Sequence, residues 1–189
     1  MKIIVVGCGK IGRTIIENLV AEGHDVTAID NNAEVLEDVT NSYDVIGLVG
    51  NGGDSDALSE AGIEGAELFI SVASSDELNM LACYIARAMG AKNTIARVRN
   101  PEYNDNSLVF LKQTLDLSTT INPEMITARE IYNIIKYPSA VNIETFARRQ
   151  FELVDFILRE DSILNGLSLA DMRKKIDAKV LVCAVHRDG

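Results

Sequence analysis

The chain opens with Lys2-Ile3-Ile4-Val5-Val6-Gly7-Cys8-Gly9-Lys10-Ile11-Gly12, and this stretch decides the fold. The run up to Val6 is short and almost wholly apolar, which is typical of a parallel strand buried on both faces. After the glycines, apolar residues recur at helical spacing, namely Ile11, Ile15, Ile16, Leu19 and Val20. The stretch therefore predicts a strand, a tight turn and a helix that begins near Lys10.

The spacing of Gly7, Gly9 and Gly12 matches a phosphate-binding turn. In such a turn Gly7 lets the backbone fold sharply, Gly9 leaves no side chain between the loop and a diphosphate, and Gly12 lets the helix lie close to the strand. The free N–H groups and the positive dipole end of the helix then face an anion. The same glycines also fit a tight turn that binds nothing.

A second strand is expected at Val26-Thr27-Ala28-Ile29, and Asp30 ends it. A carboxylate at that point would accept hydrogen bonds from the ribose hydroxyls of an adenosine. This acid after the second strand indicates dinucleotide binding more strongly than the glycines do. Alternatively, Asp30 simply caps a helix that starts at Asn32.

The alternation of strands and helices continues along the chain. Further strands are expected at 44–49, 66–72, 93–98 and 117–121, and helices from Asn31, around 57–61, over 76–89 and from Pro101. Ser74 and Glu77 have the spacing of a capping box at the start of the third of these helices. We predict a doubly wound, Rossmann-like α/β domain with a parallel sheet.

A helix over 124–135 would follow the last of these strands. It carries more apolar surface than a lone edge helix needs, in Ile126, Ile131, Ile134 and Ile135. Such a helix is expected to pack on a partner, which makes the minimal unit a homodimer.

A second, small α+β domain is expected after Tyr137-Pro138. Strands at 141–147, 151–158 and 180–185 and a helix over 168–176 are predicted there. The predicted division is a nucleotide-binding domain at 1–122, a crossover helix and linker at 123–139, and a second domain at 140–189. About fifty residues are marginal for an independent core. Asp188-Gly189 has the character of a hairpin tip without its return strand, so we expect the second domain to be incomplete.

Composition favours a soluble cytosolic protein. No apolar run in the 189 residues is long enough to span a membrane, and a formal charge of −10 disfavours binding to nucleic acid. The three cysteines, Cys8, Cys83 and Cys183, are far apart, and there are only two histidines, so neither a disulfide framework nor a zinc site is indicated. Acidic residues at helix starts are ordinary, and we predict no metal site.

Several stretches together resemble the TrkA-type potassium-uptake regulators of the RCK (KTN) family. They are Gly7 to Gly12, Gly50-Asn51-Gly52, Ser74-Ser75-Asp76-Glu77-Leu78-Asn79-Met80, Ile95-Ala96-Arg97-Val98-Arg99 and Tyr137-Pro138-Ser139-Ala140. The resemblance covers essentially the whole chain. It implies a cytoplasmic homo-oligomer that lies at the inner face of the cell membrane beneath an integral-membrane potassium transporter and is not itself inserted. Family members often carry the pair of domains twice, whereas this chain has one copy.

The resemblance also implies a site for NAD or NADH, or alternatively for ATP, ADP or AMP. Asp30 would hold the adenosine ribose, Asn51 and Gly52 would edge the adenine, Ala73 and Ser74 would line the middle of the cofactor, and Arg97 would reach a phosphate or the far ribose. The full predicted set is Gly7, Cys8, Gly9, Lys10, Ile11, Gly12, Asp30, Asn31, Asn51, Gly52, Ala73, Ser74 and Arg97. Alternatively, Ser74 is only a helix cap, and Arg97 pairs with Asp76 or Glu77.

Two functions fit this fold: a ligand-sensing regulatory subunit and an NAD-dependent oxidoreductase. An oxidoreductase needs a general acid or base near the nicotinamide. The histidines are His24, which precedes the second strand at the wrong edge of the sheet, and His186, near the end of the chain. We therefore predict a regulatory protein without catalytic residues. Asp30-Asn31-Asn32 offers no cation for a 2′-phosphate, so NAD or NADH should be preferred over NADP.

Overall fold

The computed structural model describes residues 1–103, 105–146, 150–175 and 180–187. The chain divides into two compact units, Met1–Ala128 and Arg129–Gly189. In the described residues no helix combines the length and the apolar character that crossing a membrane requires.

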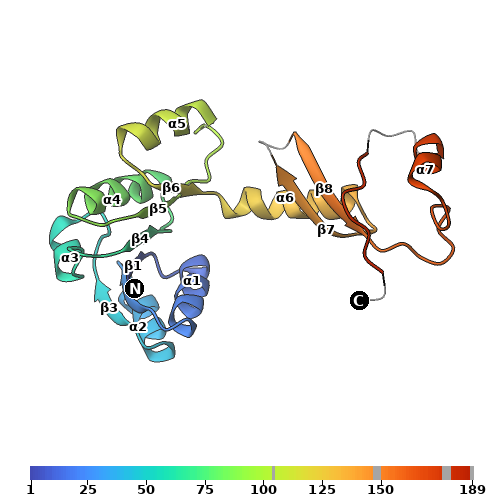
Figure 1. The fold of residues 1–189 in the computed structure, drawn as a ribbon. Coiled ribbons are helices and arrows are strands. Elements are labelled where there is room, and N and C mark those ends of the chain that lie inside the picture. The colour runs from blue at the N-terminus through green and yellow to red at the C-terminus, as the bar shows by residue number, and fades with distance from the viewer. Residues whose placement is uncertain (104, 147–149, 176–179, 188–189) are drawn as a thin grey trace. The chain divides into compact units, whose positions relative to one another are not determined.

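The first unit is built on a six-stranded parallel sheet in the order β3-β2-β1-β4-β5-β6 (Figure 1). The strands are β1 Lys2–Val6, β2 Asp25–Asp30, β3 Ile46–Val49, β4 Leu68–Ser71, β5 Thr94–Arg97 and β6 Thr119–Ile121. Val6 at the end of β1 is in register with Ile29 of β2 and with Ser71 of β4. The strand order therefore reverses between β1 and β4, where doubly wound sheets bind ligands.

Helices cover both faces of this sheet (Figure 1). They are α1 Lys10–Ala21, α2 Ala33–Ser42, α3 Ser55–Glu60, α4 Asp76–Ala88 and α5 Asp105–Thr114. Ile3 and Val5 join a buried cluster with Ile16 of α1, whereas Ile4 and Val6 join a cluster with Leu58 of α3. Because both sides of β1 are buried, its sequence is continuously apolar. The predicted Rossmann-like fold is confirmed.

Two details of the helix starts differ from the prediction. The N-cap of α4 is Ser75, whose Oγ accepts the backbone N–H of Leu78 at 3.2 Å, and not Ser74. Two adjacent serines offer two cap positions, and the helix uses the one next to Asp76. Pro101 lies in a turn, because the amide N–H of Tyr103 bonds to the carbonyl of Asn100, and α5 begins only at Asp105.

The helix α6, Pro123–Lys136, has no buried residue. The four isoleucines Ile126, Ile131, Ile134 and Ile135 are 53%, 54%, 67% and 71% exposed. The apolar face expected from the sequence is therefore present and uncovered in a single copy of the chain.

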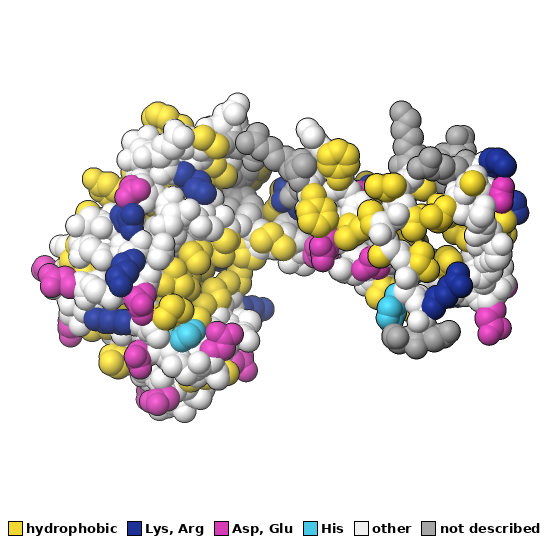
Figure 2. All heavy atoms as spheres, viewed as in Figure 1, with side chains coloured by type: hydrophobic (Ala, Val, Ile, Leu, Met, Phe, Trp, Pro, Cys, Tyr) yellow, Lys and Arg dark blue, Asp and Glu magenta, His cyan; other side chains and the backbone are white. Residues whose placement is uncertain are grey.

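The second unit contains an antiparallel hairpin of β7, Ala140–Phe146, and β8, Phe151–Phe156, followed by α7, Leu169–Lys175. Lys136 Nζ bonds to both carboxylate oxygens of Glu152 at 2.9 Å, and the Tyr137 hydroxyl donates to the same carboxylate at 2.6 Å. These contacts fasten the end of α6 to β8. Many apolar side chains remain at the surface of this unit (Figure 2), including Phe151 and Ile157.

The strand predicted over 180–185 is wrong, since residues 180–187 have no regular structure. Within the described part of this unit only β7 and β8 pair, and a lone extended segment has no ladder to stabilise it. Ala147, Ile176 and the predicted hairpin tip at Asp188-Gly189 lie outside the described residues.

Candidate functional site

The glycine turn joins β1 to α1 and touches the end of β4. Gly7 has a φ of +93°, a conformation that side chains disfavour, and a Cβ there would lie 2.7 Å from the Ala73 nitrogen. A Cβ on Gly12 would lie 1.8 Å from the carbonyl oxygen of Gly7. Both glycines are therefore required by the packing of the turn, whether or not it binds a ligand.

Gly9 differs from these two glycines. A Cβ at this position would meet no atom within 4 Å. Gly9 is the N-cap of α1, but no side chain caps this helix and its first turn carries no acid. The first N–H groups of α1 thus border an open space, which fits an anion such as a diphosphate.

Asp30 stands beside this turn and joins it to the start of α2. Its Oδ2 accepts the Cys8 N–H at 2.7 Å, and its Oδ1 accepts the Asn32 N–H at 2.9 Å. The idea that Asp30 caps α2 is wrong, because Asn32 is the N-cap and accepts from the N–H groups of Glu34 and Val35. Asn31 is exposed directly after Asp30.

The side chains of the turn have different surroundings. The Cys8 thiol is buried, and burial, reinforced by Asp30 and opposed by Arg13, raises its pKa to about 12. It is therefore a protonated part of the core, and Cys8 offers its N–H to the site. Lys10 is exposed, and Ile11 packs against the core beneath the turn.

The loop after β3 reaches the end of β1. Asn51 is exposed, and its Oδ1 accepts the Gly53 N–H at 3.0 Å. Gly52 is buried, and a Cβ there would lie 2.3 Å from Cγ1 of Val6. The structure thus brings Gly52 next to the strand that carries the glycine turn.

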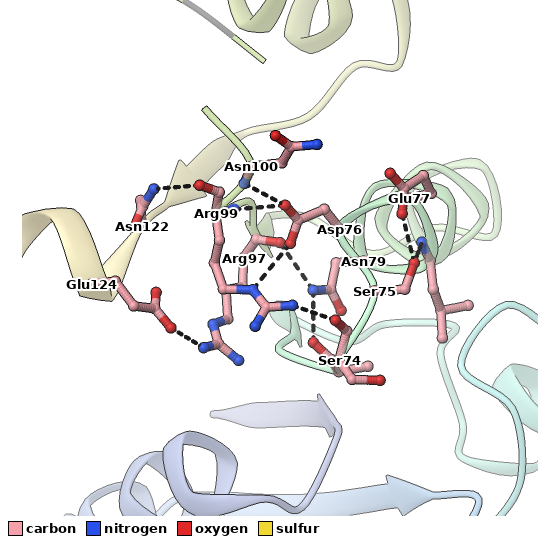
Figure 3. Close-up of polar contacts among 12 residues, drawn as sticks. Ser74, Ser75, Asp76, Glu77, Asn79, Arg97, Arg99, Asn100, Asn122 and Glu124 are labelled. Atoms are coloured by element: carbon pink, nitrogen blue, oxygen red, sulfur yellow. Dashed lines mark hydrogen bonds and ion pairs between the residues drawn. The ribbon is translucent and has the colours of Figure 1, made fainter. Parts of the chain in front are cut away.

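A buried asparagine ties together the ends of β4 and β5. Asn79 is fully buried in α4, and its Oδ1 accepts from Ser71 Oγ at 2.9 Å. Its Nδ2 donates to the carbonyls of Ala73 at 3.1 Å and Arg97 at 2.9 Å, and Figure 3 shows the amide between these segments. Asn79 stands within the stretch Ser74 to Met80 that resembles the family, but no role was predicted for it. A lone amide among the buried apolar positions of a helix was the available signal.

Asp76, also in α4, holds the chain that leaves β5. Its side chain is 6% exposed; Oδ2 accepts the N–H groups of Arg99 at 2.8 Å and Asn100 at 2.7 Å. The guanidinium of Arg99 approaches Oδ1 at 3.4 Å and donates to the carbonyl of the exposed Ser74. Asp76 therefore positions the chain after β5 directly and, through Arg99, the chain after β4 (Figure 3).

Arg97 pairs with an acid that the sequence did not suggest. Its guanidinium forms an ion pair with Glu124, in the first turn of α6, so the expected alternative of Asp76 or Glu77 is wrong (Figure 3). Glu77 instead accepts from the Ser75 and Tyr103 hydroxyls. Its own backbone N–H, followed by these two groups, lowers the pKa of Glu77.

The structure therefore gathers the predicted residues at the carboxyl ends of the strands. The glycine turn follows β1, Asp30 ends β2, Asn51 and Gly52 follow β3, Ala73 and Ser74 follow β4, and Arg97 ends β5. His24 precedes β2 and contacts Glu22 at 3.4 Å, and His186 is exposed in the second unit. In the part that the structure describes, no three His, Cys, Asp or Glu residues are grouped as a metal site would require.

Comparison with known proteins gives relatives over the full chain. It is 34% identical to the Trk system potassium uptake protein TrkA of Vibrio alginolyticus and 32% identical to a TrkA homolog of Archaeoglobus fulgidus. All of this chain is covered in both cases, but it spans only 42% of the length of each relative.

Solved structures share the fold. The TrkA-N domain of an inner membrane protein from Escherichia coli superposes with a TM-score of 0.62 at 18% identity, over 71% of this chain and 96% of that one. A GsuK channel bound to NAD superposes with a TM-score of 0.53 at 19% identity, over 64% of this chain and 21% of that one. The TrkA-N domain family matches residues 3–123, so the chain belongs to this family.

Proposed function

We propose that this chain is the NAD(H)-binding regulatory part of a potassium uptake system. The observation that carries the proposal is the open space at Gly9, bordered by uncapped N–H groups of α1 and lying beside Asp30. The names of its relatives, Trk system potassium uptake proteins, support the physiological role. NAD bound to a GsuK channel of the same fold supports the ligand class.

In this proposal the ligand lies across the carboxyl ends of the strands. Its phosphates face the turn from Gly7 to Gly12, its adenosine ribose meets Asp30 and Asn31, and its adenine meets Asn51 and Gly52. Ala73, Ser74 and Arg97 receive the distal half. NAD or NADH then binds one arrangement of the domains more tightly than another. This difference in affinity shifts the equilibrium between the two arrangements.

NAD or NADH is preferred over NADP in this proposal. A carboxylate about 4 Å from a 2′-phosphate is repelled by roughly 4 kcal/mol per unit charge at the effective dielectric of a protein surface. Asp30 is followed by Asn31 and Asn32, which supply no compensating cation. AMP, ADP and ATP share the adenosine and first phosphate, so they compete for the same place.

The partners belong to the same proposal. The uncovered apolar face of α6 packs on a second copy, which gives a homodimer or higher homo-oligomer. The assembly acts in the cytoplasm at the inner face of the cell membrane, on an integral-membrane potassium transporter. In this proposal it performs no catalysis, since His24, the histidine of the first unit, precedes β2 and therefore stands at the end of the strands opposite to the proposed ligand.

Calorimetric titration of the chain with NADH, NADPH and AMP tests the ligand. NADH and AMP should bind, and NADPH should bind at least tenfold more weakly than NADH. The absence of any adenine nucleotide binding would refute the proposal. The role is tested by measuring rubidium uptake in host cells that carry Gly9→Ala in the full-length protein. We expect the variant protein to be present at its normal level, and uptake no longer to respond to the nucleotide.

A further inference from the structure

The ion pair between Arg97 and Glu124 places an acid over a predicted ligand-binding cation. The side chain of Arg97 is 13% exposed, whereas that of Glu124 is 52% exposed. The carboxylate is therefore the more accessible member of the pair to a group that approaches from solvent. Arg97 Nε is buried and has no hydrogen-bond partner among the described residues, so only part of the guanidinium is satisfied by the chain.

The position of Glu124 is defined by its neighbours. Asn122 donates to the Arg99 carbonyl at 3.2 Å and accepts the Met125 N–H at 2.9 Å, which ties the first turn of α6 to the chain after β5. Burial acts to raise the pKa of Glu124, but its own backbone N–H and Arg97 outweigh this effect and lower the pKa. Glu124 is therefore an anion at neutral pH, held at the end of β5.

The second guanidinium at this end of β5 is also engaged. Arg99 is held by the Asp76 carboxylate and the Ser74 carbonyl. Both arginines thus already have oxygen acceptors from the chain itself (Figure 3). A ligand phosphate that reaches this place must displace Glu124 or lie beside it, and two anions at such separation repel each other.

We propose that Glu124 is a specificity-determining residue that selects ligands with an uncharged, hydroxyl-bearing distal half over ligands with a free terminal phosphate. Ribose hydroxyls donate to the Glu124 carboxylate and accept from Arg97, so they satisfy both members of the pair. A terminal phosphate is attracted by the Arg97 guanidinium but repelled by the Glu124 carboxylate. The inference rests on the proposed nucleotide site and names the part of a dinucleotide that the pair receives.

Glu124→Gln tests this inference, because glutamine keeps an oxygen acceptor for Arg97 and removes the charge. Titrations with AMP, ATP and NADH are made with a chelator present, so that no divalent cation masks the phosphate charge. ATP should bind about tenfold more tightly to the variant than to wild type. AMP should bind within about twofold of wild type, because its phosphate stays at the glycine turn, and the ratio of NADH to ATP affinity should fall about tenfold or more.

Two further variants complete the design. Glu124→Asp keeps the charge and should retain most of the wild-type preference, whereas Glu17→Gln, on the exposed surface of α1, removes one charge elsewhere and should leave every affinity unchanged. An unchanged ratio of ATP to NADH affinity in Glu124→Gln, or an equal change for all three ligands, would overturn the inference while leaving nucleotide binding established. If wild type binds none of them, the proposed function fails and the inference fails with it.

Discussion

The N–H of Cys8 lies 2.7 Å from Oδ2 of Asp30, so a backbone group of the glycine turn is bonded to the acid that ends the neighbouring strand. This contact holds the turn after β1 and the turn after β2 in one fixed arrangement. It leaves Oδ1 bonded to the Asn32 N–H at 2.9 Å. The carboxylate is thereby oriented before any ribose arrives, which lowers the ordering cost of binding.

Substitution of glycine by alanine should separate ligand binding from folding. Gly9→Ala places a methyl group in open space at a φ of −67°, so the melting temperature should change little. Affinity for NADH and AMP should fall more than tenfold, because the methyl group occupies the place of the phosphates. Gly12→Ala is the contrast: its Cβ would overlap the Gly7 carbonyl, so we expect about 1–3 kcal/mol of destabilisation by urea unfolding. Unchanged affinity in Gly9→Ala would place the phosphates elsewhere.

Asp30→Ala should weaken adenine nucleotide binding by about 1.5–3 kcal/mol, since a charged acceptor is lost. The loss of its two backbone contacts should also lower the free energy of unfolding, by about 1 kcal/mol per hydrogen bond. Asp25→Ala, at the exposed start of the same strand, is the control and should bind normally. Calorimetry well below the melting temperature measures the binding, and wild-type affinity in Asp30→Ala would contradict the placement of the ribose.

Asn79→Ala removes the amide that joins β4 to β5. Three partners, the Ser71 hydroxyl and the carbonyls of Ala73 and Arg97, would lose their contacts in a fully buried place. We expect about 2–4 kcal/mol of destabilisation in urea unfolding, from unsatisfied polar groups and a cavity together. Asn18→Ala, on the exposed side of α1, should cost less than about 0.5 kcal/mol. A loss as small as that of the control would show that β4 and β5 hold their positions without Asn79.

The cysteines should differ in reactivity. Cys8 and Cys83 are buried, and burial, the largest influence on both thiols, raises each pKa from 9.0 to about 12, whereas Cys183 is exposed. At pH 8 a disulfide reagent should therefore modify Cys183 quickly, and should modify Cys8 and Cys83 only when the protein unfolds. The unfolded chain loses these thiol protons near pH 9, whereas the folded chain keeps them up to about pH 12. The free energy of unfolding should therefore be unaffected by the two thiols below pH 9 and should fall between about pH 9 and 12. Replacing both buried cysteines by alanine should flatten that decline.

Lysines on the apolar face of α6 should prevent self-association. Ile131→Lys with Ile135→Lys puts two charges where a partner helix is expected, and sedimentation should show a monomer or aggregation in place of a dimer. Arg129→Glu changes the charge by the same amount on the opposite side of the helix, as 3.6 residues per turn places it, and should leave the dimer intact. A wild-type chain that sediments as a monomer would remove the basis for the proposed gating by domain pairing.

Local patterns predicted most of the first unit because they act over a few residues. The apolar run before Gly7, the glycine spacing and Asp30 are constrained by strand and turn chemistry, and the structure places them as expected. The partners of Arg97 and the contacts of Asn79 depend on segments far apart in the sequence, so no local pattern specifies them. The cap of α4 was predicted at Ser74 and is Ser75, because two adjacent serines could each serve as the cap.

The bare surface of α6 has a consequence for how the molecule becomes ordered. None of its 14 residues is fully buried within one copy, and isolated helices of about 12–15 residues are only marginally stable in water. Within one copy the ends of α6 are held, by the ion pair of Glu124 with Arg97 and by the contacts of Lys136 with Glu152, and in the proposed dimer a second copy covers the apolar face between them. In that dimer the ordering of the middle of α6 is a bimolecular event whose extent rises with protein concentration, so we expect dilution to fray this segment while the sheet of the first unit stays intact.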